Sequence, residues 1–174
     1  TPEEAERFRS EGFLRRAGAL DADTVETLRA EWRRLWDGLD PDADPDKVHW
    51  RDHGGGGQIA DRLDPVAAIS DVFRTAAESA ALKGLAEALL GAPAYLFKDK
   101  LITKAPNTAG YGLHQDMPYW RASGLGPEDL VTMVIALDPM TAENGAMEFY
   151  AGMHQGYLPS DSSGLDVDPA AVRD

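Results

Sequence analysis

The chain has 174 residues, of which 43% are hydrophobic, enough for one domain with a hydrophobic core. Its formal net charge of −13 repels phosphate backbones and anionic headgroups, which disfavours nucleic acid and membranes as partners. The absence of cysteine excludes disulfides, thiolate zinc sites and cysteine nucleophiles. No apolar run is long enough to span a membrane and no signal peptide opens the chain, so we expect a cytoplasmic protein.

The first predicted helix begins at the opening residues. Thr1 is suited to be its N-cap, Pro2 its first helical residue and Glu4 the partner that completes a capping box. Gly12 is expected to end it.

A second helix is predicted over residues 21–39, "DADTVETLRAEWRRLWDGL". Its apolar residues recur with helical spacing on one face: Val25, Leu28, Trp32, Leu35 and Trp36. A stripe of this kind favours packing in the core over a ligand site.

Residues 40–57, "DPDADPDKVHWRDHGGGG", are expected to form a surface loop. The alternating aspartates suggest a calcium loop, but Pro45 stands where glycine is needed and Arg51 where a bidentate glutamate is needed. Glycines 54–57 are not followed by Lys-Ser/Thr, which excludes a phosphate-binding loop. A flap over an active site is the alternative function for this loop.

Helix is predicted to restart at Asp64-Pro65 and to continue through residues 76–91, "AAESAALKGLAEALLG". Gly91 and Pro93 are expected to end it.

From residue 94 the pattern changes to that of strands. Residues 94–104 alternate, with Leu96, Lys98, Lys100, Ile102 and Lys104 on one face. Residues 129–137, "DLVTMVIAL", have the composition of a buried strand. Residues 145–153, "GAMEFYAGM", follow as a further strand, entered through the turn Glu143-Asn144-Gly145.

Helices over residues 1–93 and antiparallel strands over residues 94–174 together predict an α+β fold. The helical half is expected to pack against a sheet or barrel. We find no internal repeat and no second domain, so residues 1–174 are expected to form a single domain.

The stretch "GYGLHQDMPYW" places His114 and Asp116 two residues apart. In an extended segment such residues point to the same side and can converge on one cation. Imidazole and carboxylate are two of the three ligands in the 2-His-1-carboxylate sites of non-haem iron(II) oxygenases. Taken alone, the pair is weak evidence for a metal site, since an ordinary polar turn can contain the same two residues.

Basic and aromatic neighbours strengthen the interpretation of this pair as a site. Lys104 precedes it by one loop and is suited to hold an anionic co-substrate, and Trp120 is placed to line a substrate pocket. A solvated strand face is the alternative for all three lysines. It is favoured for Lys100, equally good for Lys98 and disfavoured for Lys104.

The segments "LITKAPNTAGYGLHQDMPYW" and "DLVTMVIALDPMTAENGAMEFYAGMHQG" resemble the phytanoyl-CoA dioxygenase family of iron(II)/2-oxoglutarate oxygenases. The resemblance covers about residues 94–158 and is weaker over "GFLRRAGALDADTVETLRAEW". It implies a double-stranded β-helix, a jelly-roll or cupin-like barrel, with the helical half packed on it.

Carried over residue by residue, the resemblance makes His114 and Asp116 ligands of Fe(II), and Lys104 a contact of 2-oxoglutarate. Lys98 and Trp120 fall at substrate-binding positions. The implied reaction is hydroxylation of a small molecule by dioxygen, with release of succinate and CO2. Related halogenases carry a small residue at the position of Asp116, so its carboxylate favours hydroxylation. Epimerisation, desaturation and ring chemistry are the open alternatives.

His154, in "YAGMHQG", matches the histidine of the family's Pro-Gly-Ser-His segment, with Ala151 in place of proline and Met153 in place of serine. That histidine is ordinarily not an iron ligand. On chemistry alone His154 is a fallback ligand, because it is the remaining histidine of the predicted β region.

The family's distal histidine and its carboxylate-binding arginine follow the Gly-x-His segment at a distance. We therefore expect them beyond Asp174, together with the C-terminal barrel strands, as in a longer enzyme. The competing hypothesis is a catalytically inactive, barrel-type binding or scaffold module with an incomplete metal site.

Overall fold

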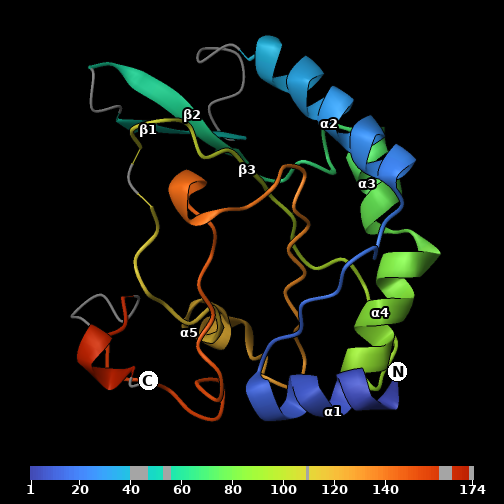
Figure 1. Cartoon of the computed structure of the whole chain (residues 1–174), viewed down its shortest axis with the longest axis vertical. Coiled ribbons are helices and arrows are strands. Elements are labelled where there is room, and N and C mark those ends of the chain that lie inside the picture. The colour runs from blue at the N-terminus through green and yellow to red at the C-terminus, as the bar shows by residue number, and fades with distance from the viewer. Residues whose placement is uncertain (40–46, 53–55, 109, 161–165, 173–174) are drawn as a thin grey trace.

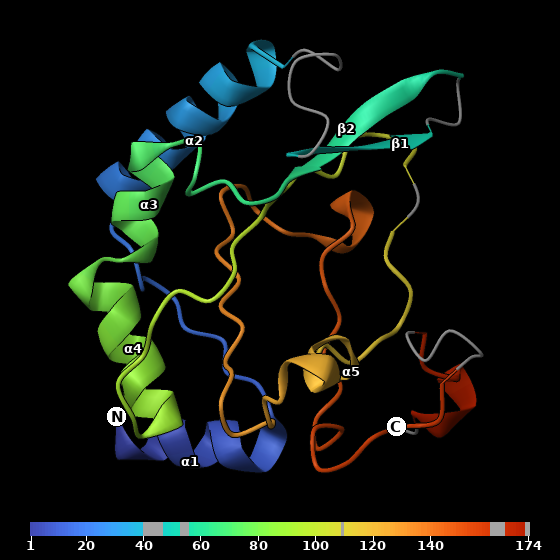
Figure 2. The same cartoon turned by 180° about the vertical axis from the view of Figure 1, so that it is seen from behind.

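A computed structural model describes residues 1–39, 47–52, 56–108, 110–160 and 166–172. The longer helices, all within residues 2–90, lie along one side and one end of the molecule, and a small antiparallel sheet, extended segments and short helices occupy the rest, as two opposite views agree (Figures 1 and 2). This mixture of helices and antiparallel strands is the α+β content that the sequence predicts. The described ranges contain no complete double-stranded β-helix.

The first helix, α1 (Pro2–Glu11), has the predicted ends. Thr1 and Glu4 form the capping box, and Gly12 ends the helix with a φ of 85° while its amide donates to the carbonyl of Phe8. This backbone conformation favours glycine, because a side chain at positive φ is strained. The prediction from the capping signals is confirmed.

The second helix, α2 (Ala22–Asp37), is the predicted amphipathic helix. The Asp21 carboxylate accepts a hydrogen bond from the amide of Thr24 at 2.7 Å and caps its start. On its apolar face Leu28 is buried, while Trp32, Leu35 and Trp36 pack against the central core. The predicted core role of this face is confirmed.

Two helices follow in place of the continuous one expected from Asp64-Pro65. The helix α3 (Asp71–Ala77) begins only at Asp71, because the side chain of Ser70 accepts from the first turn and caps it there. A second, α4 (Ala80–Leu90), ends at Gly91 as predicted. The predicted start at Asp64 is wrong, whereas the predicted end is confirmed.

A β-hairpin occupies part of the segment predicted to be a loop, so the loop prediction is wrong for the hairpin residues. The strands β1 (Val48–Asp52) and β2 (Gln58–Leu63) pair antiparallel, and β3 (Leu101–Ile102) adds to β2, giving the order β1-β2-β3. Residues 40–46 and 53–55 lie outside the described residues, and with them most of the proposed flap.

The core lies where α2 packs on this sheet. It is built from Val48, Ala60, Leu63, Val66 and Leu101. The indole Nε1 of Trp32 donates to the hydroxyl of Thr103 at 3.0 Å and joins α2 to the residue that follows β3. The predicted alternation around β3 is confirmed, since Leu101 is buried and Ile102 is 39% exposed.

The second half of the chain forms less regular structure than predicted. Of the strands expected at residues 94–104, 129–137 and 145–153, the described structure pairs only Leu101–Ile102 in a sheet. Side-chain alternation indicates which faces a strand would have, but a strand also needs a neighbour whose backbone pairs with it. Within the described residues, the strand predictions for the rest of residues 94–104, for 129–137 and for 145–153 are therefore wrong.

Short helices connect these extended segments. They are α5 (Met117–Trp120), η1 (Arg121–Ser123), η2 (Ala142–Asn144) and η3 (Pro169–Ala171). The predicted Glu143-Asn144-Gly145 turn is confirmed as the end of η2, where Gly145 has a φ of 80°. None of the helices in the described ranges has both the length and the hydropathy to cross a bilayer.

Candidate metal centre

The side chains of His114 and Asp116 face each other. The imidazole Nε2 lies 3.5 Å from a carboxylate oxygen of Asp116. The backbone around His114 is held by an isolated antiparallel bridge to Asp166, and Asp116 directly precedes α5. Both side chains are partly exposed, so a ligand from solvent can reach them.

One hydrogen bond selects which imidazole nitrogen can bind a metal. Nδ1 of His114 lies 2.7 Å from the carbonyl oxygen of Gly112 and donates to it, since a carbonyl only accepts. In the neutral ring the lone pair is therefore on Nε2, the nitrogen that faces Asp116. The Asp116 carboxylate raises the pKa of His114 above its usual value, and the Gly112 carbonyl acts in the same direction.

Thr132 orients the carboxylate of Asp116. Its hydroxyl donates to one carboxylate oxygen, Oδ2, at 3.2 Å, while the other, Oδ1, faces His114. The contact with His114, followed by that with Thr132, lowers the pKa of Asp116 and favours its charged form. Sequence reasoning missed Thr132, although it is the one hydroxyl in the apolar run "DLVTMVIAL".

Lys104 contacts the turn at residues 143–145. Its ammonium donates a hydrogen bond to the carbonyl oxygen of Gly145, 41 residues later in the chain. An ammonium has three N–H donors, so this bond leaves capacity for an anion. The 2-oxoglutarate contact of Lys104 stays a prediction.

The structure brings together Lys98 and Trp120, the two residues predicted to bind substrate. The Lys98 ammonium lies 5.7 Å from the centre of the Trp120 ring, and the rings of Phe97 and Trp120 pack in a T-shaped arrangement with their centres 5.1 Å apart. Lys98 also forms an ion pair with Asp64 at 3.1 Å. Asp64 is only 12% exposed, and its carboxylate partly compensates the positive charge of Lys98 beside the aromatic rings.

The ring of His154 packs against the end of α1. Its Nε2 lies 2.9 Å from the carbonyl oxygen of Arg9, and a Cβ at Gly12 would come within 2.2 Å of its Nδ1. A histidine that contacts the final carbonyls of a helix stabilises the helix end. This geometry disfavours the fallback role of His154 as an iron ligand.

The donor set at His114 and Asp116 fits part of an iron(II) site. An imidazole nitrogen with a free lone pair and a charged carboxylate are two of the ligand types that this metal takes in oxygenases. No group of three or more histidine, cysteine, aspartate or glutamate residues in the described ranges is placed to hold a metal. The described residues thus bring together two donors suited to such a metal, and the ligand roles of His114 and Asp116 stay predictions.

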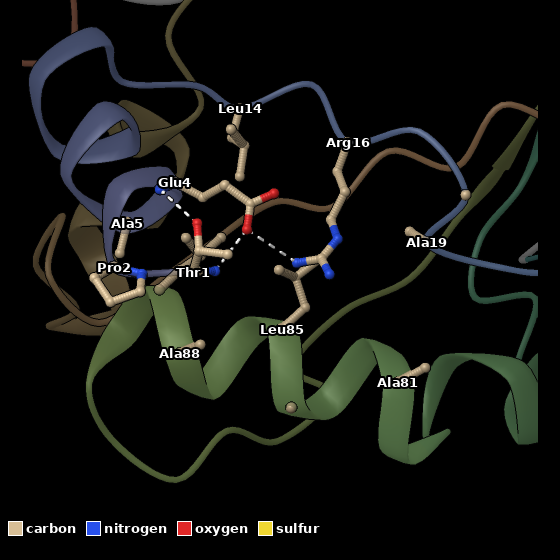
Figure 3. A pocket seen from close by; sticks show the side chains of 13 residues that line it. Thr1, Pro2, Glu4, Ala5, Leu14, Arg16, Ala19, Ala81, Leu85 and Ala88 are labelled. Carbon is tan, nitrogen blue, oxygen red and sulfur yellow. Dashed lines mark hydrogen bonds and ion pairs between the residues drawn. The ribbon is translucent and has the colours of Figure 1, made fainter.

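A cavity of about 570 Å³ lies elsewhere, between α1 and α4. Figure 3 shows its lining of small aliphatic side chains, among them Leu14, Leu85 and Ala88, with Glu4 beside Arg16. The Glu4 and Arg16 side chains approach to 3.5 Å. None of the predicted site residues lines this cavity, so it is separate from the candidate metal centre.

Comparison with known proteins gives the family. The family model described as "Phytanoyl-CoA dioxygenase (PhyH)" matches residues 8–170. The chain belongs to the phytanoyl-CoA dioxygenase family. The resemblance found in the sequence motifs is thereby confirmed over almost the whole chain.

Individual relatives share part of their length with this chain. L-Proline trans-4-hydroxylase of Streptomyces griseoviridis is 39% identical over 85 residues, 48% of this chain and 32% of that protein. Methylphosphonate hydroxylase of Gimesia maris is 29% identical over 168 residues, 94% of this chain and 61% of that protein. The chain therefore spans less than two thirds of the length of either relative.

Among solved structures, the epimerase SnoN in complex with Fe3+, alpha ketoglutarate and nogalamycin RO is similar to part of this phytanoyl-CoA dioxygenase family member. The TM-score is 0.42 and the sequence identity 28%. The match covers 52% of this chain and 32% of that one.

Proposed function

We propose that the intact protein is an iron(II)- and 2-oxoglutarate-dependent dioxygenase that hydroxylates a small molecule. The observation that carries this proposal is the approach of His114 Nε2 to the Asp116 carboxylate at 3.5 Å. Family membership over residues 8–170 supports it. So do the names of the relatives, a proline hydroxylase and a methylphosphonate hydroxylase.

In the proposed site, His114 and Asp116 hold the metal. Bound iron supplies the redox chemistry by which one atom of dioxygen enters succinate and the other the hydroxylated product, with release of CO2. The chain's own residues position the reactants. Gly112 keeps the Nε2 lone pair of His114 available, and Thr132 directs Oδ1 of Asp116 toward it.

Lys104 is proposed to bind a carboxylate of 2-oxoglutarate while remaining attached to Gly145. Phe97 and Trp120 are proposed to line the substrate pocket, where their rings exclude water from the bound molecule. Lys98 is proposed to contact the substrate with a charge that Asp64 partly compensates. A barrel architecture, as in the implied double-stranded β-helix, is part of the same proposal.

The test is formation of succinate from 2-oxoglutarate in the presence of Fe(II) and dioxygen, comparing wild type with Asp116→Ala. Loss of a metal ligand is expected to lower the rate more than about 100-fold, since changes even beyond the ligands cost 10–100-fold. Asp138→Ala is the matched control, because Asp138 is 59% exposed and pairs with Arg29 at the surface. Equal, negligible turnover by wild type and Asp116→Ala would instead favour the inactive binding module.

A further inference from the structure

Gln115, the residue between the two proposed ligands, binds one distant segment of the chain through three hydrogen bonds. Its Nε2 donates to the carbonyl oxygens of Met153 at 2.7 Å and Gly156 at 2.8 Å. Its Oε1 accepts from the amide of Leu158 at 3.0 Å. Both donor hydrogens and the acceptor of the amide are used, so its orientation is fully determined.

The segment that Gln115 binds, residues 153–158, is held at two further points. The guanidinium of Arg121 stacks on the ring of Tyr157 at 3.6 Å, and His154 contacts the end of α1 through Arg9. Residues 153–158 therefore provide a firm attachment point for the Gln115 side chain.

The backbone just before Gln115 is anchored as well. The carbonyl of Leu113 accepts from the amide of Val167 at 2.7 Å, and Val167 is buried. Gln115 reaches residues 153–158 while the side chains of His114 and Asp116 meet each other. Anchoring the middle residue thus restricts rotation of the backbone that carries both neighbours.

We propose that Gln115 is a positioning residue for the metal site. Its three hydrogen bonds to residues 153–158 hold the backbone so that the His114 imidazole and the Asp116 carboxylate converge on one cation. This inference rests on the proposed function, because it assumes that these two side chains bind a divalent metal. It adds that metal affinity depends on a side chain that does not touch the metal.

The experiment is titration of the intact protein with Co(II), a spectroscopic substitute for Fe(II), followed by its visible absorption bands. The main variant is Gln115→Glu, which keeps the size of the side chain but removes both donors and places a carboxylate against two carbonyl oxygens. Gln155→Glu makes the same change within the same segment, at an exposed side chain. Asp116→Ala reports whether the cobalt signal belongs to the proposed site.

For Gln115→Glu we expect the dissociation constant of Co(II) to rise about 10-fold or more and the absorption bands to shift. Gln155→Glu is expected to match wild type. Should Gln115→Glu fail to fold, Gln115→Asn decides the matter. Its neutral amide is one methylene too short to reach all three backbone groups, and we expect a rise in the dissociation constant of several-fold.

Two results would overturn the inference in distinguishable ways. If wild type binds Co(II) through Asp116 and the folded Gln115 variants bind it with unchanged affinity and spectrum, Gln115 has no positioning role and the proposed function stands. The same conclusion holds if a Gln115 variant unfolds at a lower temperature but binds cobalt as the wild type does, because Gln115 then stabilises the fold without positioning the site. If wild type shows no cobalt binding that depends on Asp116, the proposed function and the inference fail together.

Discussion

Two regions of this chain are stabilised in different ways. Within the described residues, ten of the eleven buried apolar side chains precede residue 102, and Val167 is the other. All thirteen exposed large apolar side chains lie from Tyr95 onwards. The helices and hairpin thus have a core, whereas the segments that carry the candidate metal centre are held largely by polar contacts.

This difference has a consequence for the effects of mutations. Burial of apolar surface is the main source of folding free energy, so stability should depend on the first region. Hydrogen bonds such as those of Gln115 and Lys104 contribute less to stability but determine where side chains point. Function should therefore be more sensitive than stability to changes in the second region.

The largest effect on stability is expected for Leu63→Ala. Leu63 is completely buried at the centre of the core, and removing such a side chain costs about 2–5 kcal/mol in free energy of unfolding. Leu96→Ala is the matched control, since Leu96 is 45% exposed and should cost less than about 1 kcal/mol. Urea unfolding measures both, and equal losses would contradict the proposed division into two regions.

Gly12→Ala comes next, because it perturbs the junction between the two regions. A Cβ there would lie 2.2 Å from Nδ1 of His154, at a backbone φ of 85°. Strain at positive φ and overpacking together should cost roughly 2–4 kcal/mol. Gly91→Ala is the matched control, because Gly91 has a similar φ of 70° but an added Cβ would have no atom within 4 Å. Its loss of unfolding free energy should therefore reflect backbone strain alone, about 1 kcal/mol. Thermal unfolding of the two variants measures the difference. Identical losses of stability for Gly12→Ala and Gly91→Ala would show that His154 does not pack on α1.

The acid dependence of stability is expected to involve Glu31. Hydrogen bonds from Arg34, together with one from Ser70 at 2.6 Å, lower its pKa from 4.5 to about 2. A lowered pKa means that this stabilisation is present above pH 4.5 and is lost as pH falls toward 2. Glu31→Gln should cost roughly 1–3 kcal/mol at pH 7.

The check is the difference in unfolding free energy between wild type and Glu31→Gln measured from pH 7 to pH 2.5. We expect the difference to shrink as pH falls below 4.5. The exposed Glu6→Gln, whose carboxylate is 75% accessible, should show almost no difference at any pH. A Glu31→Gln effect that does not change with pH would rule out a charged, paired Glu31 as its source.

The smallest effect is expected at Thr132, in the polar second region. Thr132→Val keeps the shape but removes the hydroxyl that orients Asp116, and should lower the rate of succinate formation by about 3- to 10-fold with little loss of stability. Thr132→Ser retains the hydroxyl and should restore most of the rate. Equal rates for the valine variant and wild type would leave Thr132 without a role in positioning.

The sequence predicted best those features that local chemistry determines. The ends of α1 and the apolar face of α2 follow from residues a few positions apart, and both are confirmed. The hairpin β1–β2 was missed, since its short strands lie among acidic and glycine-rich residues typical of loops. The strands expected at residues 129–137 and 145–153 failed because pairing depends on a neighbour that the pattern does not specify.

The candidate site shows the same limit. The spacing of His114 and Asp116 predicted that the two side chains meet, which they do at 3.5 Å. The groups that support them come from far along the chain. Thr132 lies sixteen residues after Asp116, and the backbone partners of Gln115 lie 38 to 43 residues after it. No spacing rule connects such residues, because their proximity is created by the tertiary fold.

The most direct test of the central claim is diffraction from crystals of the intact protein grown with Mn(II), which scatters anomalously. We expect an anomalous peak bonded to Nε2 of His114 and to a carboxylate oxygen of Asp116. A peak at His154 in place of that site, or no peak between His114 and Asp116 at saturating Mn(II), would contradict it.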